Sequence, residues 1–391
     1  MNGSGVGEGA GERRETGRRE TGRRETGRHE TGLHETERHE TGLHETEHSA
    51  VVELGRMPTL GPSYGRAVVG AARSGLGRGA HRSVGPADLL RTTLVVRGIQ
   101  AEADRLTDYQ HLVGEPAGDA LPAGFVHVLA FPLATALMVR PGFPLSALGM
   151  IHTENRVVQR RGVRLGESLD VRVRAEDLRA HRSGVTVDLV AEVSVGDEQV
   201  WVGRSTYLAK GVAWGGAAPA GLASEHGLEA GAESRPDRGL GAGPESRPDH
   251  GLGAGAANRP DRGPGAGERR EFVPPVPTGQ WRLAADVGRR YAAVSGDRNP
   301  IHLSPVAAKA FGFPRTSAHG MYTAARALAD VGPDRGDAFT WDVEFSAPVL
   351  LPSTVMMRVA RLGATSGAGF EFVGWDARRG RRHFVGTVSP V

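Results

Sequence analysis

The stretch SAHGMYTAARALADVGPDRGDAFTWDVEF, residues 317–345, decides the fold of the C-terminal part of the chain. Its first half predicts a helix from Gly320 to Val331. From Phe339 to Phe345 apolar and polar residues alternate without a break, which predicts a strand with one buried face. In the C-terminal part, the sequence therefore predicts a helix that is followed closely by a half-buried strand.

The residues on either side extend this pattern into a helical half followed by a stranded half. Upstream, Asp286 is positioned to cap a helix through Val294, and Ser304-Pro305 to start one over 306–311. Downstream, strand-like segments at 354–359, 369–375 and 383–388 are separated by glycines. An antiparallel meander wrapped around one central helix would bury these apolar faces, so the fold class is α+β.

The first half of the chain repeats this plan. An apolar helix is predicted from Phe125 to Met138 despite Pro132, and strands are predicted at 148–158, 168–174, 185–195 and 199–208. An internal duplication explains the similarity. Two such units in tandem could join their sheets edge to edge and so protect the exposed strands.

Two repetitive tracts separate these units from the rest of the chain. A five-residue repeat with almost no apolar side chains fills much of residues 1–50, and a twelve-residue repeat rich in Gly and Pro runs from Ser234 to Arg269. Both compositions are typical of disorder. The predicted organisation is a tail at 1–50, an N-terminal domain at 51–213 with its folded core from about 86, a linker at 214–270 and a C-terminal domain at 271–391.

Composition excludes several classes of function. The chain has no cysteine, so disulfides, thiolate metal sites and cysteine nucleophiles are ruled out. The formal charge is +3, and no basic helix or aromatic platform supports nucleic-acid binding. No apolar segment is long enough to cross a membrane, and the N-terminus does not resemble a secretory signal. We expect a cytoplasmic protein without nucleic-acid partners or membrane insertion.

Residues 291–302, YAAVSGDRNPIH, carry the candidate chemistry. Asp297, Asn299 and His302 lie within six residues of one another, around a proline that restricts the backbone on both sides. A carboxylate, a carboxamide and an imidazole at this spacing suit acid/base catalysis on a small molecule. The alternative is a simple turn, because Gly, Asp, Asn and Pro are the usual turn residues.

A comparison within the chain assigns this segment to the second unit alone. The two helix-opening stretches align with His127 opposite His319 and Val128 opposite Gly320. The interval from Tyr291 to His319 is ten residues longer than the matching interval in the first unit, which lacks the GDxNPxH segment. We therefore expect the C-terminal unit to be the catalytic one.

The motif Y-x3-S-G-D-x-N-P-x-H-x5-A resembles the signature of the MaoC-like family, the (R)-specific (type 2) enoyl-CoA hydratases and 3-hydroxyacyl thioester dehydratases. An HGM sequence opens the next helix, where the family has it. The resemblance implies the hot-dog fold, in a tandem form with a degenerate N-terminal unit and a catalytic C-terminal unit. The positions that carry it are Tyr291, Ser295, Gly296, Asp297, Asn299, Pro300, His302 and Ala308.

The chemistry of such a reaction gives each motif residue a candidate role. Asp297 and His302 could hold one water between them, and which of the two is the base stays open. Asn299 could orient the loop or the water. The backbone N–H of Gly320, at a helix start, could stabilise negative charge on the thioester oxygen, or the glycine could simply relieve crowding.

Four further residues are candidates for substrate binding: Tyr291, Ser295, His319 and Met321. Tyr291 and Ser295 could equally pack or bond within the motif loop, and His319 could be a capping or core residue. Asp297, Asn299 and His302 have no second His or carboxylate at metal-ligand spacing, so no metal is expected. The only cofactor group expected is the coenzyme A or acyl-carrier thioester of the substrate. The apolar 125–138 helix could line an acyl tunnel or be ordinary core.

These observations favour a lyase that hydrates trans-2-enoyl-CoA to (R)-3-hydroxyacyl-CoA, or runs in reverse. One alternative is a dehydratase of fatty-acid or polyketide synthesis that acts on acyl carrier protein. Another is a non-catalytic subunit that binds acyl thioesters. The expected assembly is a pseudo-dimer within one chain, which could itself form a homodimer.

Overall fold

The computed structural model describes residues 50–59, 61, 83–86, 89, 91–216, 272–363 and 368–391. The chain divides into two units, Met1–Glu47 and His48–Val391, and all described residues belong to the second. The predicted tail and linker therefore lie outside the described residues, apart from Ala50 and residues 214–216.

An eleven-stranded sheet is the main feature of the described residues. Its strand order is β1-β2-β6-β7-β8-β4-β10-β13-β12-β11-β9, and every neighbouring pair is antiparallel except β1 and β2. A short pair, β3 Ala120–Leu121 and β5 Val163–Arg164, lies apart from it. The strands are β1 Ala50–Glu53, β2 Thr92–Ile99, β4 Ile151–Gln159, β6 Leu169–His181, β7 Gly184–Val195, β8 Glu198–Lys210, β9 Gly279–Leu283, β10 Phe339–Phe345, β11 Ser353–Arg361, β12 Phe370–Asp376 and β13 Arg382–Pro390.

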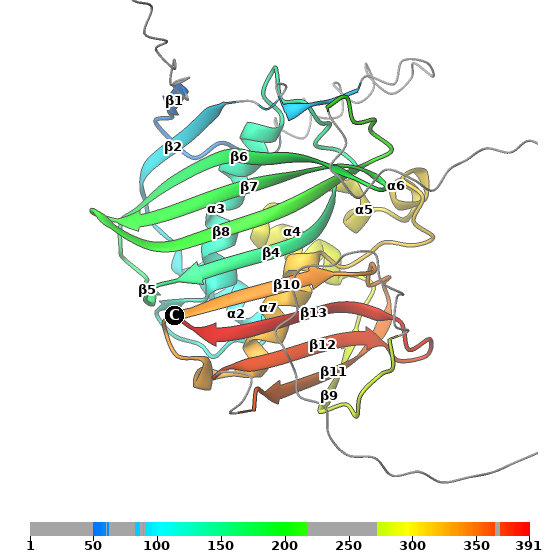
Figure 1. The fold of residues 1–391 in the computed structure, drawn as a ribbon. Helices are drawn as coiled ribbons and strands as arrows, with labels where there is room; N and C mark the ends of the chain where they lie inside the picture. Colours follow the sequence, from blue (N-terminus) through cyan, green and yellow to red (C-terminus); the bar gives the residue numbers. More distant parts are fainter. Residues whose placement is uncertain are drawn as a thin grey trace, which may run out of the picture. The chain divides into compact units, whose positions relative to one another are not determined.

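Three helices, α3, α4 and α7, lie behind the sheet in Figure 1, which matches the predicted plan of helices wrapped by a meander. α3 is buried on nearly every side and contains Pro132. None of the described helices is both long and apolar enough to span a membrane. The helices are α2 Ala103–Val113, α3 Ala123–Met138, α4 Val287–Ser295, α5 Pro300–Leu303, α6 Pro305–Ala310, α7 Gly320–Val331 and the short 3₁₀ helix η2 Pro333–Arg335.

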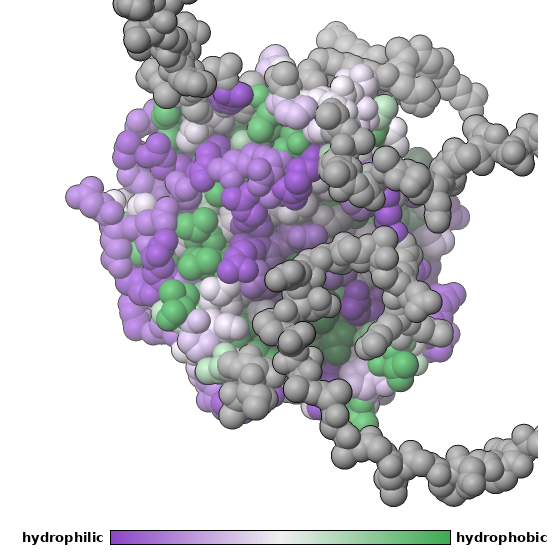
Figure 2. Space-filling model, in the orientation of Figure 1, coloured by the Kyte–Doolittle hydropathy of each residue, from purple (hydrophilic) through white to green (hydrophobic). Residues whose placement is uncertain are grey.

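The alternation of apolar and polar residues explains the two faces of the sheet. In β10, Phe339 and Trp341 are buried toward the helices, while Asp342 and Glu344 lie on the other face. That outer face is largely hydrophilic over β6, β7 and β8 (Figure 2), where arginines and carboxylates form ion pairs across the strands. The core therefore lies between the sheet and the helices.

The two units join through the pairing of β4 with β10, side by side at the middle of the sheet (Figure 1). Six residue pairs are in antiparallel register, from Phe339 opposite Gln159 to Glu344 opposite Glu154. The prediction that the two sheets meet edge to edge is therefore confirmed. Backbone hydrogen bonds hold the two halves together in addition to side-chain packing.

The helices of the two units also contact each other. Tyr109 of α2 and Tyr291 of α4 have ring centroids 6.5 Å apart. Arg105 Nε donates to the Val294 carbonyl over 2.8 Å, which links α2 to the end of α4. The alignment of the helix starts is wrong in one respect. α3 begins at Ala123, so His127 lies in its second turn, whereas His319 directly precedes α7.

Candidate active site

The loop after α4 holds the Asp297 side chain in place. Gly296 ends the helix with φ of 77°, a left-handed conformation that suits glycine. The Asp297 N–H then donates to Ser295 Oγ over 3.1 Å, and Asp297 Oδ1 accepts from the Asn299 N–H over 3.1 Å. The segment is thus a turn, as one interpretation had it, and it also fixes a carboxylate whose side chain is 22% exposed.

Asn299 and Pro300 begin a four-residue helix, α5, that carries His302. Asn299 is the N-cap, and its side-chain oxygen accepts from the Ile301 N–H over 3.5 Å. Proline at the first helical position has the right φ and loses no needed hydrogen bond. Asn299 therefore caps α5 and bonds within the loop, and a role in orienting a water stays a prediction.

The ring of His302 is oriented by the segment before α7. Nδ1 lies 2.8 Å from the Ser317 carbonyl oxygen and 3.3 Å from Ser317 Oγ. A carbonyl can only accept, so Nδ1 carries the proton and Nε2 has the free lone pair. Burial lowers the pKa of His302, although the Asp297 charge and the Ser317 carbonyl raise it in part. The neutral ring is therefore ready to accept a proton.

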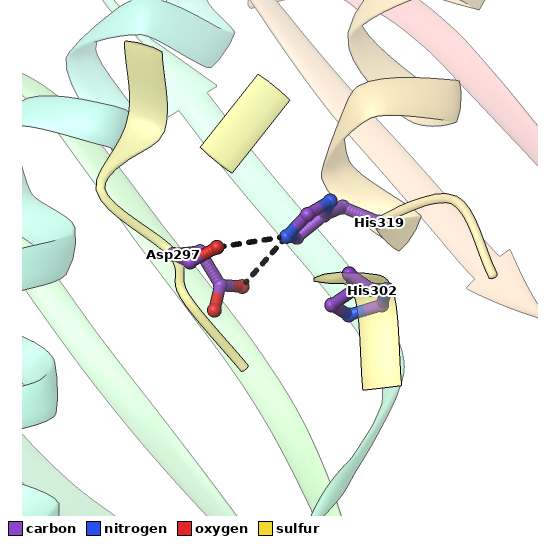
Figure 3. A group of neighbouring side chains, drawn as sticks. All are labelled: Asp297, His302 and His319. Carbon is purple, nitrogen blue, oxygen red and sulfur yellow. Dashed lines mark hydrogen bonds and ion pairs between the residues drawn. The ribbon is translucent and has the colours of Figure 1, made fainter. Parts of the chain in front are cut away.

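His319 lies beside both Asp297 and His302 (Figure 3). Its Nε2 lies 3.0 Å from the Asp297 carbonyl oxygen and 3.7 Å from Asp297 Oδ2. Its ring stacks on that of His302 with centroids 3.7 Å apart. Burial, and then the His302 ring, lower its pKa to about 3, so neutral His319 donates its Nε2–H to the Asp297 carbonyl. This contact positions Asp297, and no side-chain cap bond is made to α7.

Gly320 is the first residue of α7. Among the described residues no group accepts a hydrogen bond from its N–H, which lies at the positive end of the helix dipole. A Cβ at this position would lie 3.2 Å from the Phe345 ring. Both proposed reasons for the glycine are therefore consistent with the structure: its N–H is available to a ligand, and its surroundings are crowded.

The other candidates for substrate contact are all deeply buried. Tyr291 packs its ring 4.9 Å from that of His319, and Ser295 binds the Asp297 N–H. Met321 lies in the first turn of α7. Each of the three is at most 6% exposed, and their contact with substrate stays a prediction.

Gly288 is a supporting residue that the sequence reasoning missed. It lies in α4, and a Cβ there would lie 2.4 Å from the His302 carbonyl oxygen. The helix bearing Tyr291 and the helix bearing His302 therefore approach each other more closely than any side chain allows.

We expect Gly288→Ala to move α5 and lower kcat by about tenfold or more, because small displacements of catalytic groups are costly. Overpacking should also lower the thermal midpoint. Steady-state kinetics and thermal unfolding measure both effects. Gly279→Ala is the control, because a Cβ at Gly279 meets nothing within 4 Å. Equal kinetics for the two variants would contradict the proposed packing.

The site also has the spacing of a metal centre. One ligand atom from each of Asp297, His302 and His319 lies within 4.8 Å of the others. The expectation that no second histidine completes such a group is therefore wrong, because the fold brings His319 to the motif. One nitrogen of each ring already contacts a backbone carbonyl, so a metal ion bound here would replace one of these contacts or take the other nitrogen.

We expect dialysis against EDTA to leave kcat unchanged, because Asp297 and His302 already provide a proton acceptor without a metal. The measurement compares dialysed enzyme with enzyme given back zinc or magnesium. A loss of activity that the metal restores would show that the three residues form a metal centre.

The buried histidines should make the stability depend on pH. Burial lowers the pKa of His127 to about 4, and that of His152 and His319 to about 3. In the unfolded chain the pKa of each is about 6.5. The unfolded state therefore binds more protons between these values, so the stabilising contribution is present above pH 6.5 and is lost as the pH falls toward 4.

We expect the free energy of unfolding to drop by several kcal/mol between pH 7 and pH 4.5, as measured by urea titration. His127→Gln should reduce this dependence, because one of the contributing groups is removed. An unfolding free energy that does not change over this range would show that these rings are not buried in their neutral form.

The first unit also contributes to the surroundings of Asp297, which the sequence did not indicate. Burial lowers the pKa of His127 and raises that of Tyr207, and the negative charge of Asp297 raises the pKa of both to a smaller extent. The His152 ring lies between them, 6.4 Å from His127 and 4.6 Å from Tyr207. No local motif marks these residues, because the β4–β10 junction and the packing of α3 against α4 and α7 bring them near the second unit.

Comparison with known proteins agrees with this architecture. The model of the MaoC like domain matches residues 263–373. The 3-hydroxyacyl-thioester dehydratase X of Mycobacterium tuberculosis is 33% identical over 299 residues, which are 76% of this chain and 89% of that protein. The 3-hydroxybutyryl-CoA dehydratase of Methylorubrum extorquens is 36% identical over 98 residues, which are 21% of this chain and 62% of that protein.

A solved structure shares this fold over most of the chain. The crystal structure of HtdX of Mycobacterium tuberculosis matches with a TM-score of 0.58 and 31% identity, over 76% of this chain and 100% of that one. The fold class predicted from the sequence is therefore confirmed. The chain belongs to the MaoC-like family of hydro-lyases, in the form that carries two hot-dog units.

Proposed function

We propose that this protein hydrates trans-2-enoyl-CoA to (R)-3-hydroxyacyl-CoA, or catalyses the reverse dehydration. The observation that supports this most directly is the placing of Asp297 and His302 together beside the N-terminus of α7. The names of the two dehydratases that it resembles agree with an acyl-thioester substrate.

The pair supplies an acceptor for each proton of one water molecule. A carboxylate oxygen of Asp297 and one ring nitrogen of His302 lie within 4.8 Å of each other, so one water could bridge the two side chains. Asp297 accepts one proton of this water and His302 Nε2 the other, since His302 Nδ1 is occupied by Ser317. His319 and Asn299 hold Asp297 in place for this task.

Hydration then proceeds by proton transfer within this group. One of the pair takes a proton from the water, and the water oxygen forms a bond to the β-carbon of the enoyl thioester. The electrons of the double bond move toward the thioester oxygen, where the Gly320 N–H and the α7 dipole stabilise the charge. The proton is returned to the α-carbon. Dehydration follows the same steps in reverse.

The main alternative within this proposal concerns the carrier of the acyl group, which is either coenzyme A or acyl carrier protein. A dehydratase of fatty-acid or polyketide synthesis would perform the same chemistry on acyl carrier protein. A non-catalytic acyl-thioester-binding subunit would not need Asp297 and His302 held in this way. Membership of a family of dehydratases also speaks against it. A homodimer of the chain stays a prediction.

The test is the loss of the conjugated enoyl absorbance when purified protein meets trans-2-enoyl thioesters of short, medium and long chain. Each acyl group is offered on coenzyme A and on acyl carrier protein, and the ratio of kcat/KM decides the carrier. Chiral analysis of the product decides between the (R) and (S) alcohols. Absence of turnover on both carriers at every length would refute the proposal, and an (S) product would refute its stereochemistry.

A further inference from the structure

A half-buried arginine of the first unit contacts the end of the helix that precedes the motif loop. Arg105 lies in the first turn of α2, and its Nε donates to the Val294 carbonyl of α4 over 2.8 Å. The two residues are 189 positions apart in the chain. Both hot-dog units therefore contribute to the structure at the C-terminus of α4.

The surroundings of Arg105 within its own unit do not favour a cation. A positive charge in the first turn of a helix opposes the helix dipole. Burial lowers the pKa of Arg105, and the charge of Glu102 offsets this only in part. Among the described residues no carboxylate lies within ion-pair distance of the guanidinium, and a charge removed from water without such a partner is unfavourable. The stability of α2 alone therefore does not explain this arginine.

The contact with α4 gives the positive charge a favourable place. The last carbonyls of a helix have no partner within the helix, and they carry a partial negative charge. A cation at this end is stabilising, yet α4 has no basic residue in its own last turn. Arg105 supplies from the first unit the cation and the hydrogen-bond donor that α4 lacks.

The Val294 carbonyl lies at the start of the segment that places Asp297. This carbonyl and the nitrogen of Ser295 belong to one planar peptide unit, so a bond to the carbonyl oxygen also restrains Ser295. Ser295 Oγ accepts from the Asp297 N–H over 3.1 Å, and Gly296 between them has the φ of 77° that ends the helix. A shift of the last turn of α4 would therefore reach Asp297 within three residues.

We propose that Arg105 is a positioning residue for the reaction. Through the Val294 carbonyl it holds the end of α4, and with it the carboxylate of Asp297, in the geometry that proton transfer requires. Small displacements of a catalytic group are costly in rate, so a distant contact of this kind affects turnover. This inference rests on the proposed function, because it acts through the role proposed for Asp297. It also gives the unit that lacks the motif a part in the chemistry of the other unit.

The test is a double-mutant cycle of Arg105→Met and Asp297→Asn. Methionine keeps an unbranched stem without a donor or a charge, so we expect kcat to fall about tenfold or more while KM stays within about threefold. In the Asp297→Asn background the same substitution should lower kcat by less than about twofold, because no carboxylate is left to position. Arg105→Lys keeps a cationic donor and should recover part of the loss. Arg97→Met, at an exposed arginine of β2, is the control and should keep the wild-type kcat.

Wild-type kcat in folded Arg105→Met, or an equal loss in the Asp297→Asn background, would overturn the inference. If Arg105→Met does not fold, Arg105→Lys decides, and a folded lysine variant that loses about tenfold in kcat would overturn it too. Hydrogen exchange of the amides in residues 291–302, measured by mass spectrometry, separates this inference from the proposed function. Faster exchange in Arg105→Met, without enoyl turnover by any form, would refute the function and keep the positioning contact. Turnover with unchanged kcat and exchange would refute the inference alone, and neither turnover nor a change in exchange would refute both.

Discussion

Replacing Asp297 by asparagine is expected to lower kcat for enoyl hydration by about a thousandfold, because general acid/base groups contribute roughly 10²–10⁴ to a rate. Asparagine keeps an oxygen that can accept the Asn299 N–H, so the loop should keep its shape. The amide, however, cannot take a proton from water. The measurement is kcat from loss of the enoyl absorbance at saturating substrate.

Asp342→Asn is the matched control for this variant. Asp342 lies on the outer face of β10 and pairs with Arg156 over 2.9 Å. Exposed ion pairs of this kind contribute at most about 1 kcal/mol, so this variant should keep full activity. The thermal midpoint of Asp297→Asn should lie within a few degrees of wild type. If Asp297→Asn retains more than about a tenth of the activity, Asp297 does not transfer the proton.

The second large effect is expected at His302. In His302→Asn the side-chain amide could donate to the Ser317 carbonyl in place of Nδ1–H. The substitution removes Nε2, which we propose accepts a proton of the water. We expect kcat to fall by about a hundredfold or more with little change in folding.

The pH profile of wild type provides an independent check of this role. Because burial lowers the pKa of His302 below its ordinary value, the acid limb of kcat/KM should lie below pH 6.5 if His302 must be neutral. His111→Asn, on the exposed side of α2, is the control and should leave the profile unchanged. Near wild-type activity of His302→Asn would eliminate His302 as a partner of the water.

Much of the fold could be predicted because its signals are local. The strand at Phe339–Phe345 and the helix at Gly320–Val331 were predicted with the bounds that the structure gives. In both, the spacing of apolar residues follows the buried face. The short helix α5 was not predicted, since Asn299-Pro300 is equally typical of a turn and of a helix start, and four residues carry no periodicity.

The features of the site that the sequence did not predict are contacts between segments that are distant in the chain. His319 contacts Asp297 across 22 positions of sequence, and the segment before it is held by a bond from the Ala318 N–H to the Val349 carbonyl. The approach of His127 and Tyr207 to Asp297 depends on the packing of α3 against α4 and α7 and on the strand register between the two units. Neither is visible as a local motif, whereas the residues of the motif loop itself could be named in advance.

The pairing of β4 with β10 has a consequence for how the sequence of the chain can change. Backbone hydrogen bonds, which do not depend on side-chain identity, set the register between the strands of the two units. Side chains of the first unit can therefore be exchanged without a shift of this register. Under the proposed function, and with Arg105 set aside, the groups that react and the neighbouring unit that supports them can vary independently in evolution or in design.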